Sequence, residues 1–201
     1  MTLTLKIAIV GSGNIGEGLG RAWAKKKHDV TFGARDPKGA ELVALCAEIG
    51  AKASSVVDAV KSADVVAFAM PWGAVDDVLK QVGGLDGKIV IDCTNAVERG
   101  PTGMHMTEFP GSSSSEEIQK RIPKAHVVKS FNAQGAENLR EPTYGGVKSS
   151  NFYCGDDATA KAKVRQLIED VGFDAVDAGP LKSARLLAPM MLLWITCAQT
   201  G

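Results

Sequence analysis

The sequence lacks an excess of charge of either sign, and it lacks cysteine patterns. Its 201 residues carry 23 basic and 23 acidic side chains, with no run of five or more like charges. Electrostatic binding to nucleic acid is therefore not expected. The four cysteines lie more than forty residues apart, which fits neither a CxxC metal site nor a small disulfide scaffold. We expect reduced thiols and no bound metal.

Long hydrophobic runs are also missing. The longest apolar stretch, residues 186–195, is about half the length that a bilayer requires, and Pro189 interrupts it. The first residues lead directly into a strand pattern, without the basic and apolar segments of a signal peptide. The sequence therefore predicts a cytoplasmic protein that contacts no membrane and whose partner is a small molecule.

Aromatic residues make up 5% of the chain, and only two of them are tyrosines, Tyr144 and Tyr153. Both stand far along the chain, so the tyrosine–lysine signature of short-chain reductases is absent. His105, His126 and Lys129 are the other acid–base candidates, and no pattern marks any of them as catalytic. We assign no catalytic residue. This suits a reaction in which hydride passes between two redox cofactors and the protein mainly stacks their rings.

Apolar runs alternate with helical patterns, which is typical of an α/β fold with a mainly parallel sheet. The serines at 112–115 stand at capping-box spacing from Glu116 and Glu117, so they favour a helix cap over a flexible linker. Residues 94–115 look irregular. The whole pattern predicts a Rossmann-type doubly wound domain over residues 1–129 and a small C-terminal α/β extension over residues 130–201. The individual elements are expected as strands near 5–10, 30–33, 65–69, 88–92 and 125–131, and as helices near 15–27, 40–49, 75–82 and 156–170.

A G-x-G-x-x-G motif follows the first predicted strand and opens an amphipathic helix. Gly11 permits the tight turn, Gly13 lets the backbone approach a pyrophosphate, and Gly16 lets the helix pack closely on the strand. Free N–H groups and the positive end of the helix then face the phosphates. The motif predicts a dinucleotide site at Gly11, Ser12, Gly13, Asn14, Ile15 and Gly16.

The second predicted strand ends in Gly33, Ala34 and Arg35, where a carboxylate is expected if the cofactor is NAD. A carboxylate binds the ribose 2′-hydroxyl of NAD, whereas a guanidinium attracts the 2′-phosphate of NADP. Arg35, with Lys38 behind it, therefore predicts NADP(H) as the cofactor. The alternative is a solvated Arg35 paired with Asp36.

Three further segments stand at predicted strand ends: "AMPWGAV", "DCTNAV" and "KSFNAQG". The carboxyl ends of parallel strands meet at the edge where doubly wound folds bind ligands. Proline fixes a turn there, tryptophan offers an aromatic face, and asparagine amides suit a carboxamide. We predict that these segments surround the nicotinamide through Met70, Pro71, Trp72, Val75, Asn95, Asn132 and Ala133.

The segments "KIAIVGSGNIGEGLGRAWAKKKHDVTFGARDP", "SFNAQGAENL" and "FYCGDDATAKAKVRQLIEDVGFDAVDAGPLKSARLLAPMMLLWI" resemble the NADP oxidoreductases dependent on the deazaflavin coenzyme F-420. The resemblance implies NADPH on the glycine motif, with Arg35 at the 2′-phosphate. It also implies a deazaflavin facing the nicotinamide across a cleft roofed by residues 131–135 and by the C-terminal part of the chain. Ala34 departs from the family, which has small hydroxyl side chains there. A related resemblance is to the NADPH- and flavin-using domain of the six-transmembrane ferric reductases.

Several functions remain open at this point. The first is hydride transfer between NADPH and a flavin-like acceptor, with coenzyme F-420 foremost. The second is an NADPH-dependent reductase of a small imine or ketone, or of a flavin or ferric acceptor. The third is an NADPH-binding sensor without turnover. The last predicted helix, "ARLLAPMMLLWITCAQ", is apolar nearly all round, so we also expect a homodimer in which it helps form the interface or the acceptor pocket.

Overall fold

The chain forms a mixed α/β structure, described for residues 4–101 and 103–200 in a computed structural model. The strands are β1 (Lys6–Val10), β2 (Asp29–Gly33), β3 (Lys52–Ser54), β4 (Val65–Phe68), β5 (Ile89–Asp92), β6 (Val97–Gly100), β7 (Gly103–Met106), β8 (His126–Ser130), β9 (Thr143–Tyr144), β10 (Val147–Lys148), β11 (Ser150–Gly155) and β12 (Asp174–Asp177). The helices are α1 (Asn14–Lys25), α2 (Ala40–Ile49), α3 (Val56–Ser62), α4 (Val75–Val82), α5 (Ser114–Arg121), α6 (Ala136–Arg140), α7 (Ala158–Val171) and α8 (Ala184–Thr200), with short 3-10 turns η1 (Trp72–Ala74) and η2 (Leu181–Ser183).

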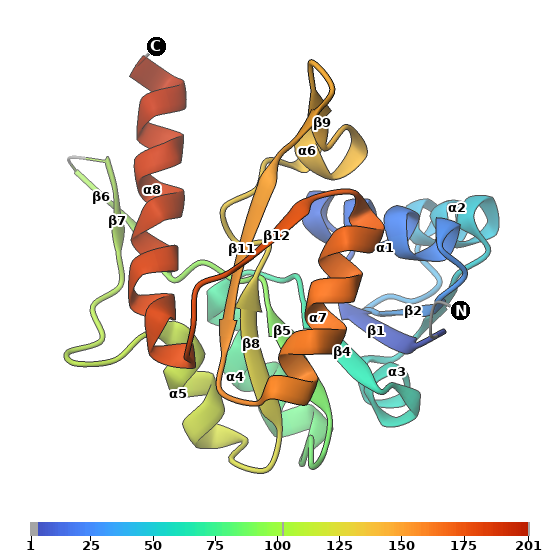
Figure 1. Ribbon diagram of the computed structural model, residues 1–201. Helices are drawn as coiled ribbons and strands as arrows, with labels where there is room; N and C mark the ends of the chain where they lie inside the picture. Colours follow the sequence, from blue (N-terminus) through green and yellow to red (C-terminus); the bar gives the residue numbers. More distant parts are fainter. Residues whose placement is uncertain (1–3, 102, 201) are drawn as a thin grey trace.

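The central sheet has eight strands in the order β12-β11-β8-β5-β4-β1-β2-β3 (Figure 1). Neighbours run parallel except for β11 and β8, which are antiparallel. The chain moves outward from β1 to β3 and then returns to the other side of β1 as β4, so the topological switch point lies between β1 and β4. The predicted Rossmann-type fold is confirmed. Strands β11 and β12, which follow residue 130, extend the same sheet.

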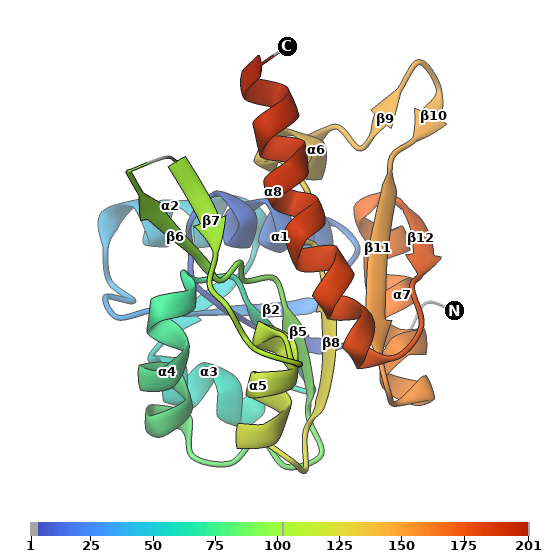
Figure 2. The same cartoon turned by 90° about the vertical axis from the view of Figure 1, so that its left-hand side faces the viewer.

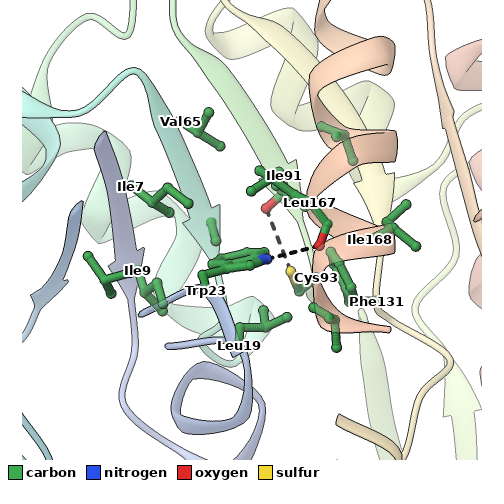
Figure 3. Close-up of a cluster of buried hydrophobic side chains, with 14 of the residues drawn as sticks. Ile7, Ile9, Leu19, Trp23, Val65, Ile91, Cys93, Phe131, Leu167 and Ile168 are labelled. Atoms are coloured by element: carbon green, nitrogen blue, oxygen red, sulfur yellow. Dashed lines mark hydrogen bonds between the residues drawn. The ribbon is translucent and has the colours of Figure 1, made fainter. Parts of the chain in front are cut away.

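Helices cover both faces of this sheet. Helices α1, α2 and α7 pack on one face, and α3, α4 and α5 pack on the other (Figure 2). Trp23 is fully buried in the first layer, where its Nε1–H donates to the Leu167 carbonyl at 3.0 Å and joins α1 to α7 (Figure 3). Its ring also meets Phe131 edge-on, with centroids 5.9 Å apart. The core thus ties the start of the chain to the segment after β8.

Predicted elements agree closely with the structure where the periodic pattern of apolar residues extends over many residues. The helices expected at 40–49 and 75–82 are α2 and α4. The helix cap is also confirmed, because Ser113 Oγ accepts the Glu116 N–H at 3.3 Å and opens α5. Two short antiparallel hairpins, β6–β7 and β9–β10, were not predicted. The first lies in the stretch that looked irregular, because its four-residue strands are mixed in polarity and flanked by glycine.

Helix α8 stands away from the sheet and extends beyond the body of the molecule (Figures 1 and 2). The window Leu181–Ala198, which includes η2, is long and apolar enough by length and composition to cross a membrane, with a mean hydropathy of 1.3. Within this structure 28% of the window is buried. A window of this kind is weak evidence, since apolar helices of soluble proteins have the same composition. The absence of a membrane contact therefore stays a prediction.

The first turn of α8 is joined to α5 by an ion pair. Arg185 donates to both carboxylate oxygens of Glu116, at 2.9 and 2.7 Å. These hydrogen bonds lower the pKa of Glu116 below its ordinary value of 4.5. Because the pKa of Glu116 is lower in the folded than in the unfolded chain, the ion pair stabilises the fold at pH values above the unfolded-state pKa. This stabilisation is lost as the pH falls through the folded-state pKa.

Replacing Arg185 with methionine should remove this pH-dependent stabilisation. We expect the wild type to be more stable than the variant by less than about 1 kcal/mol at neutral pH, because the pair is partly exposed. The difference should shrink as the pH falls below 4.5. Urea denaturation of both proteins across this range measures it. A difference in unfolding free energy that stays the same at every pH would contradict the pairing of Arg185 with Glu116.

Candidate functional site

Two adjoining cavities follow the carboxyl ends of β1, β4 and β5, beside the switch point. They share Gly13, Ala69, Met70 and Pro71. One, of about 430 Å³, extends toward the end of β2 and is lined by residues that include Gly11, Ser12, Ala34, Arg35, Asp77 and Gln81. The other, of about 630 Å³, extends toward β5 and the β6–β7 hairpin and is lined by residues that include Asn14, Trp72, Thr94, Asn95, Glu98 and Thr107. Together they form an elongated trough with the glycine turn at its middle.

The glycine turn is built for a close approach by a ligand. Gly11 has φ +107°, and a Cβ there would lie 2.5 Å from the Ala69 carbonyl oxygen. A Cβ on Gly16 would lie 2.0 Å from the Gly11 carbonyl oxygen, so α1 can pack on this turn only with glycine there. At Gly13 a Cβ would meet no protein atom within 4 Å, so the space above it is open. Gly13 caps α1 without a side-chain hydrogen bond, which leaves the first N–H groups of the helix available to an anion.

Arg35 is exposed at the end of β2 and lines the smaller cavity. No ion pair holds its guanidinium within residues 4–101 and 103–200, and the alternative pairing with Asp36 is not observed there. Asp36 instead accepts the Lys38 N–H at 3.1 Å and closes the turn. The guanidinium is therefore available to a phosphate at this end of the trough.

A third cavity, of about 520 Å³, lies between α1 and α2. Its lining carries four carboxylates and one guanidinium, from Glu17, Asp36, Glu41, Glu48 and Arg21. Arg21 is already paired with Glu17 at 2.9 Å and with Glu48, also at 2.9 Å through Nη2. The excess of carboxylates disfavours an anionic ligand in this cavity, so the trough is the better candidate for the predicted dinucleotide site.

The far end of the trough is shaped by Trp72 and two asparagines. Trp72 is held edge-on against Phe109, with centroids 5.5 Å apart. Asn95 Nδ2 donates to the Asn132 carbonyl at 2.8 Å, and Asn132 Nδ2 donates to Asn95 Oδ1 at 3.3 Å and to the Leu187 carbonyl at 2.9 Å. These bonds fix the Asn95 amide in the cavity that Trp72 also lines, and they connect it to the first turn of α8.

A backbone turn at Phe131 makes this contact between the asparagines possible. Phe131 has φ 60°, a left-handed conformation that is unusual for a bulky residue and costs about 1–3 kcal/mol. Its buried ring packs against Trp23 and Phe173, with centroids 5.9 and 6.5 Å away. Core packing thus stabilises the turn that carries Asn132 to Asn95.

Comparison with known proteins agrees with this geometry. Residues 6–96 match the model of a family described as "NADP oxidoreductase coenzyme F420-dependent". A solved structure from Arthrobacter sp. FB24, provisionally named an F420-dependent NADP reductase, is 29% identical with a TM-score of 0.89. It covers 97% of this chain and 94% of its own. The chain belongs to this family. The family is one of NADP oxidoreductases.

Two other relatives show how far the similarity extends. A hypothetical protein from Sinorhizobium meliloti, SMa0349, is 32% identical with a TM-score of 0.79, over 90% of this chain and 88% of its own. Metalloreductase STEAP3 of Rattus norvegicus is 28% identical over 181 residues, which are 90% of this chain. The oxidoreductase spans only 35% of the length of that curated relative. The two relatives that carry a functional name are both reductases, one named for F420 and NADP and the other for a metal.

Most of the predicted site residues of the oxidoreductase lie together. The two cavities are lined by Gly11, Ser12, Gly13, Asn14, Ile15, Arg35, Met70, Pro71, Trp72 and Asn95. Five other predicted residues do not line either cavity: Gly16, Lys38, Val75, Asn132 and Ala133. Gly16 and Val75 are buried supports, and Asn132 acts through Asn95. Lys38 is exposed on the turn after β2.

Lys129 is fully buried beneath the site and is paired. Its Nζ lies 3.1 Å from Asp92 Oδ2 and also donates to the Thr94 carbonyl. Asp92 Oδ1 accepts from the Thr94 N–H and hydroxyl at 2.9 and 2.7 Å, and Oδ2 accepts from Ser115 Oγ at 2.5 Å. This network holds the turn that carries Asn95. Lys129 is therefore a support for the site of the oxidoreductase, with no path to a ligand.

The Cys93 thiol lines the larger cavity without being activated. Burial raises its pKa well above the ordinary value, and the nearby Asp92 carboxylate acts in the same direction. Its Sγ lies 3.9 Å from the Ile91 carbonyl oxygen (Figure 3). A thiol in this state is a small apolar group rather than a nucleophile or redox centre. Over the described ranges, no group of side chains suited to a metal ion is present.

Four polar residues that line the two cavities escaped the sequence analysis: Asp77, Gln81, Glu98 and Thr107. Asp77 and Gln81 stand one helical turn apart on α4, and their spacing could have indicated a polar helix face turned toward the site. Glu98 and Thr107 come from the unpredicted β6–β7 hairpin and the residue after it. No sequence pattern marked them, because their proximity depends on strand pairing.

Proposed function

We propose that this oxidoreductase transfers a hydride between NADPH and a flavin-type acceptor, with the deazaflavin coenzyme F-420 as the first candidate. The observation that supports it is the 630 Å³ cavity, which joins the glycine turn directly to the Trp72 and Asn95 side chains. A nicotinamide and part of a second ring can be accommodated face to face in a space of this size. The family and the relative from Arthrobacter sp. FB24 support the choice of acceptor.

The chain's own groups have distinct tasks in this proposal. The free N–H groups at the start of α1 bind the pyrophosphate, and Arg35 binds the 2′-phosphate. Asn95, fixed by Asn132, orients the carboxamide, while Met70, Pro71 and Trp72 shield the ring from water. NADPH supplies the hydride itself when bound. The protein contributes mainly alignment, which can account for a large part of a hydride-transfer rate.

The acceptor can be identified with purified protein by visible absorbance. NADPH is mixed in parallel with oxidised deazaflavin, with FMN or with no acceptor, and the series is repeated with NADH. Bleaching of the deazaflavin with NADPH, and little with NADH, is expected. Binding of NADPH without reduction of any acceptor would contradict the proposed turnover, and it would favour a different small substrate or a sensor.

Arg35 should determine the preference for NADPH over NADH. Replacement by alanine removes a charge-assisted hydrogen bond to the 2′-phosphate, so the KM for NADPH should rise about 10- to 100-fold. The KM for NADH should barely change, because NADH has no phosphate there. Steady-state kinetics with both cofactors measures this. Arg140→Ala is the matched control, since Arg140 is exposed and lines neither cavity. Equal effects of R35A on both cofactors would exclude the assigned role.

We also propose a cytoplasmic homodimer, with residues 1–129 as the NADP-binding part and residues 130–201 completing the acceptor side. The dimer is supported by α8, on which Leu186, Leu193 and Trp194 are 73%, 65% and 39% exposed. Apolar side chains on one projecting helix favour burial against a partner. Light scattering after size exclusion is expected to give twice the monomer mass, and a monomer would exclude the proposal.

A further inference from the structure

Glu98 is a carboxylate on β6 at the end of the larger cavity. The proposed hydride transfer gives it no task. Among the described residues that line this cavity, Glu98 and Cys93 are the ionisable ones, and the Cys93 thiol stays neutral. Strand β5, which leads into the β6–β7 hairpin, is separated from β1 by β4. Glu98 therefore lies on the side of the cavity away from the glycine turn.

One hydrogen bond orients the exposed Glu98 carboxylate, and one imidazole lies near it. Thr107 Oγ1 donates to Oε1 at 3.1 Å, and His105 Nε2 lies 3.7 Å from Oε2. His105 is the partner of Glu98 in the antiparallel register of β6 and β7, so the strand pairing itself produces this contact. A carboxylate offers about four acceptor positions. The hydroxyl and the imidazole leave acceptor positions for a ligand.

We propose that Glu98 binds the acceptor by accepting its ring N–H, the N3–H between two carbonyls that flavins and deazaflavins share. This inference rests on the proposed function, because it concerns the second substrate of that same site. Trp72 offers an aromatic face on which such a ring can stack, and Glu98 offers the hydrogen-bond acceptor that its polar edge requires. A ring methylated at N3 cannot make this bond.

Equilibrium binding to the NADP⁺-loaded protein tests the proposal without requiring turnover. The ligands are lumiflavin and its N3-methyl derivative, and binding is followed by flavin fluorescence. The wild type should bind the N3–H ring about 10-fold more tightly, as expected for a hydrogen bond to a charged group. E98A should remove this preference, because it should weaken binding of the N3–H ligand and leave binding of the N3-methyl ligand unchanged. The same pair of ligands on a 5-deazaflavin ring shows which ring system the site prefers.

Two further variants show whether the preference depends on the Glu98 carboxylate itself. E98Q keeps an acceptor oxygen and loses the charge, so its preference should be intermediate. Glu108→Gln makes the same charge change at an exposed acid that does not line the cavity, and it should leave the wild-type preference unchanged. NADPH affinity should change less than about twofold in every variant, because Glu98 lies away from the phosphate sites.

The outcomes separate this proposal from the proposed function. The role of Glu98 would be overturned if the wild type bound the N3–H and N3-methyl rings equally well. It would also be overturned if E98A weakened binding of both rings to the same extent, even if flavin is reduced. Selective binding that depends on Glu98, without reduction by NADPH, would support the role of Glu98 and overturn the hydride transfer.

Discussion

Replacing Gly13 with valine is expected to abolish NADPH binding while the fold stays intact. The backbone at Gly13 has φ −71° and ψ −175°, an extended conformation that valine adopts readily. An added Cβ meets no protein atom within 4 Å, so the free energy of unfolding should fall only by the roughly 1 kcal/mol that an apolar N-cap costs α1. The branched side chain instead occupies the space that a pyrophosphate needs. Loss of two charge-assisted hydrogen bonds weakens NADPH binding about 100-fold or more.

Gly16→Ala is the contrasting variant in the same motif. Its Cβ would lie 2.0 Å from the Gly11 carbonyl oxygen, so α1 has to move and the variant should lose stability. Thermal denaturation and calorimetric titration with NADPH, applied to both variants, separate the two effects. If G13V unfolded at a lower temperature by as much as G16A, or bound NADPH normally, the assignment of the open space to the pyrophosphate would be wrong.

Lys129→Ala should destabilise the protein by about 3–5 kcal/mol, because it leaves the carboxylate of Asp92 buried without its counter-ion. Both side chains have no exposed surface, and Nζ lies 3.1 Å from Oδ2. Removal of the ammonium also leaves the Thr94 carbonyl without that donor. Because Thr94 precedes Asn95, we expect weaker NADPH binding in whatever fraction remains folded. Urea denaturation at neutral pH gives the change in free energy.

The matched control for this prediction is Lys124→Ala. Lys124 and Asp86 form a pair of almost the same length, 3.0 Å, but their side chains are 74% and 62% exposed. An exposed pair of this kind contributes about 0–1 kcal/mol. A loss in K129A as small as that in K124A would mean that water reaches the Lys129 pair, and the network under the site would then carry little stability.

The sequence predicted the parts of the site that depend on local pattern. The glycine motif, Arg35 and the segment around Trp72 each follow a strand whose apolar run is recognisable, and the fold of parallel strands brings their ends together. The predicted cap at Ser113 also depends on neighbours three residues apart. These features need no knowledge of distant contacts.

Other parts of the site depend on contacts between distant segments. Glu98 reaches the cavity only because β6 and β7 pair, and neither strand has a clear alternation of polar and apolar residues. Asn132 looked like a direct ligand because it follows β8, yet it hydrogen-bonds Asn95 and the Leu187 carbonyl. The buried ion pair of Lys129 likewise depends on Asp92, 37 residues away. Side-chain partners of this kind are set by tertiary packing and leave no periodic signal.

The three tryptophans are distributed so that each gives a separate optical signal. Trp23 is fully buried in the core, Trp72 lines the cavity, and Trp194 is 39% exposed on α8. Emission from Trp23 should shift only when the core unfolds, whereas a bound reduced nicotinamide should quench Trp72 first. Trp194 should change when the outer part of α8 is covered. Single-tryptophan versions of the chain can therefore follow folding, cofactor binding and association independently.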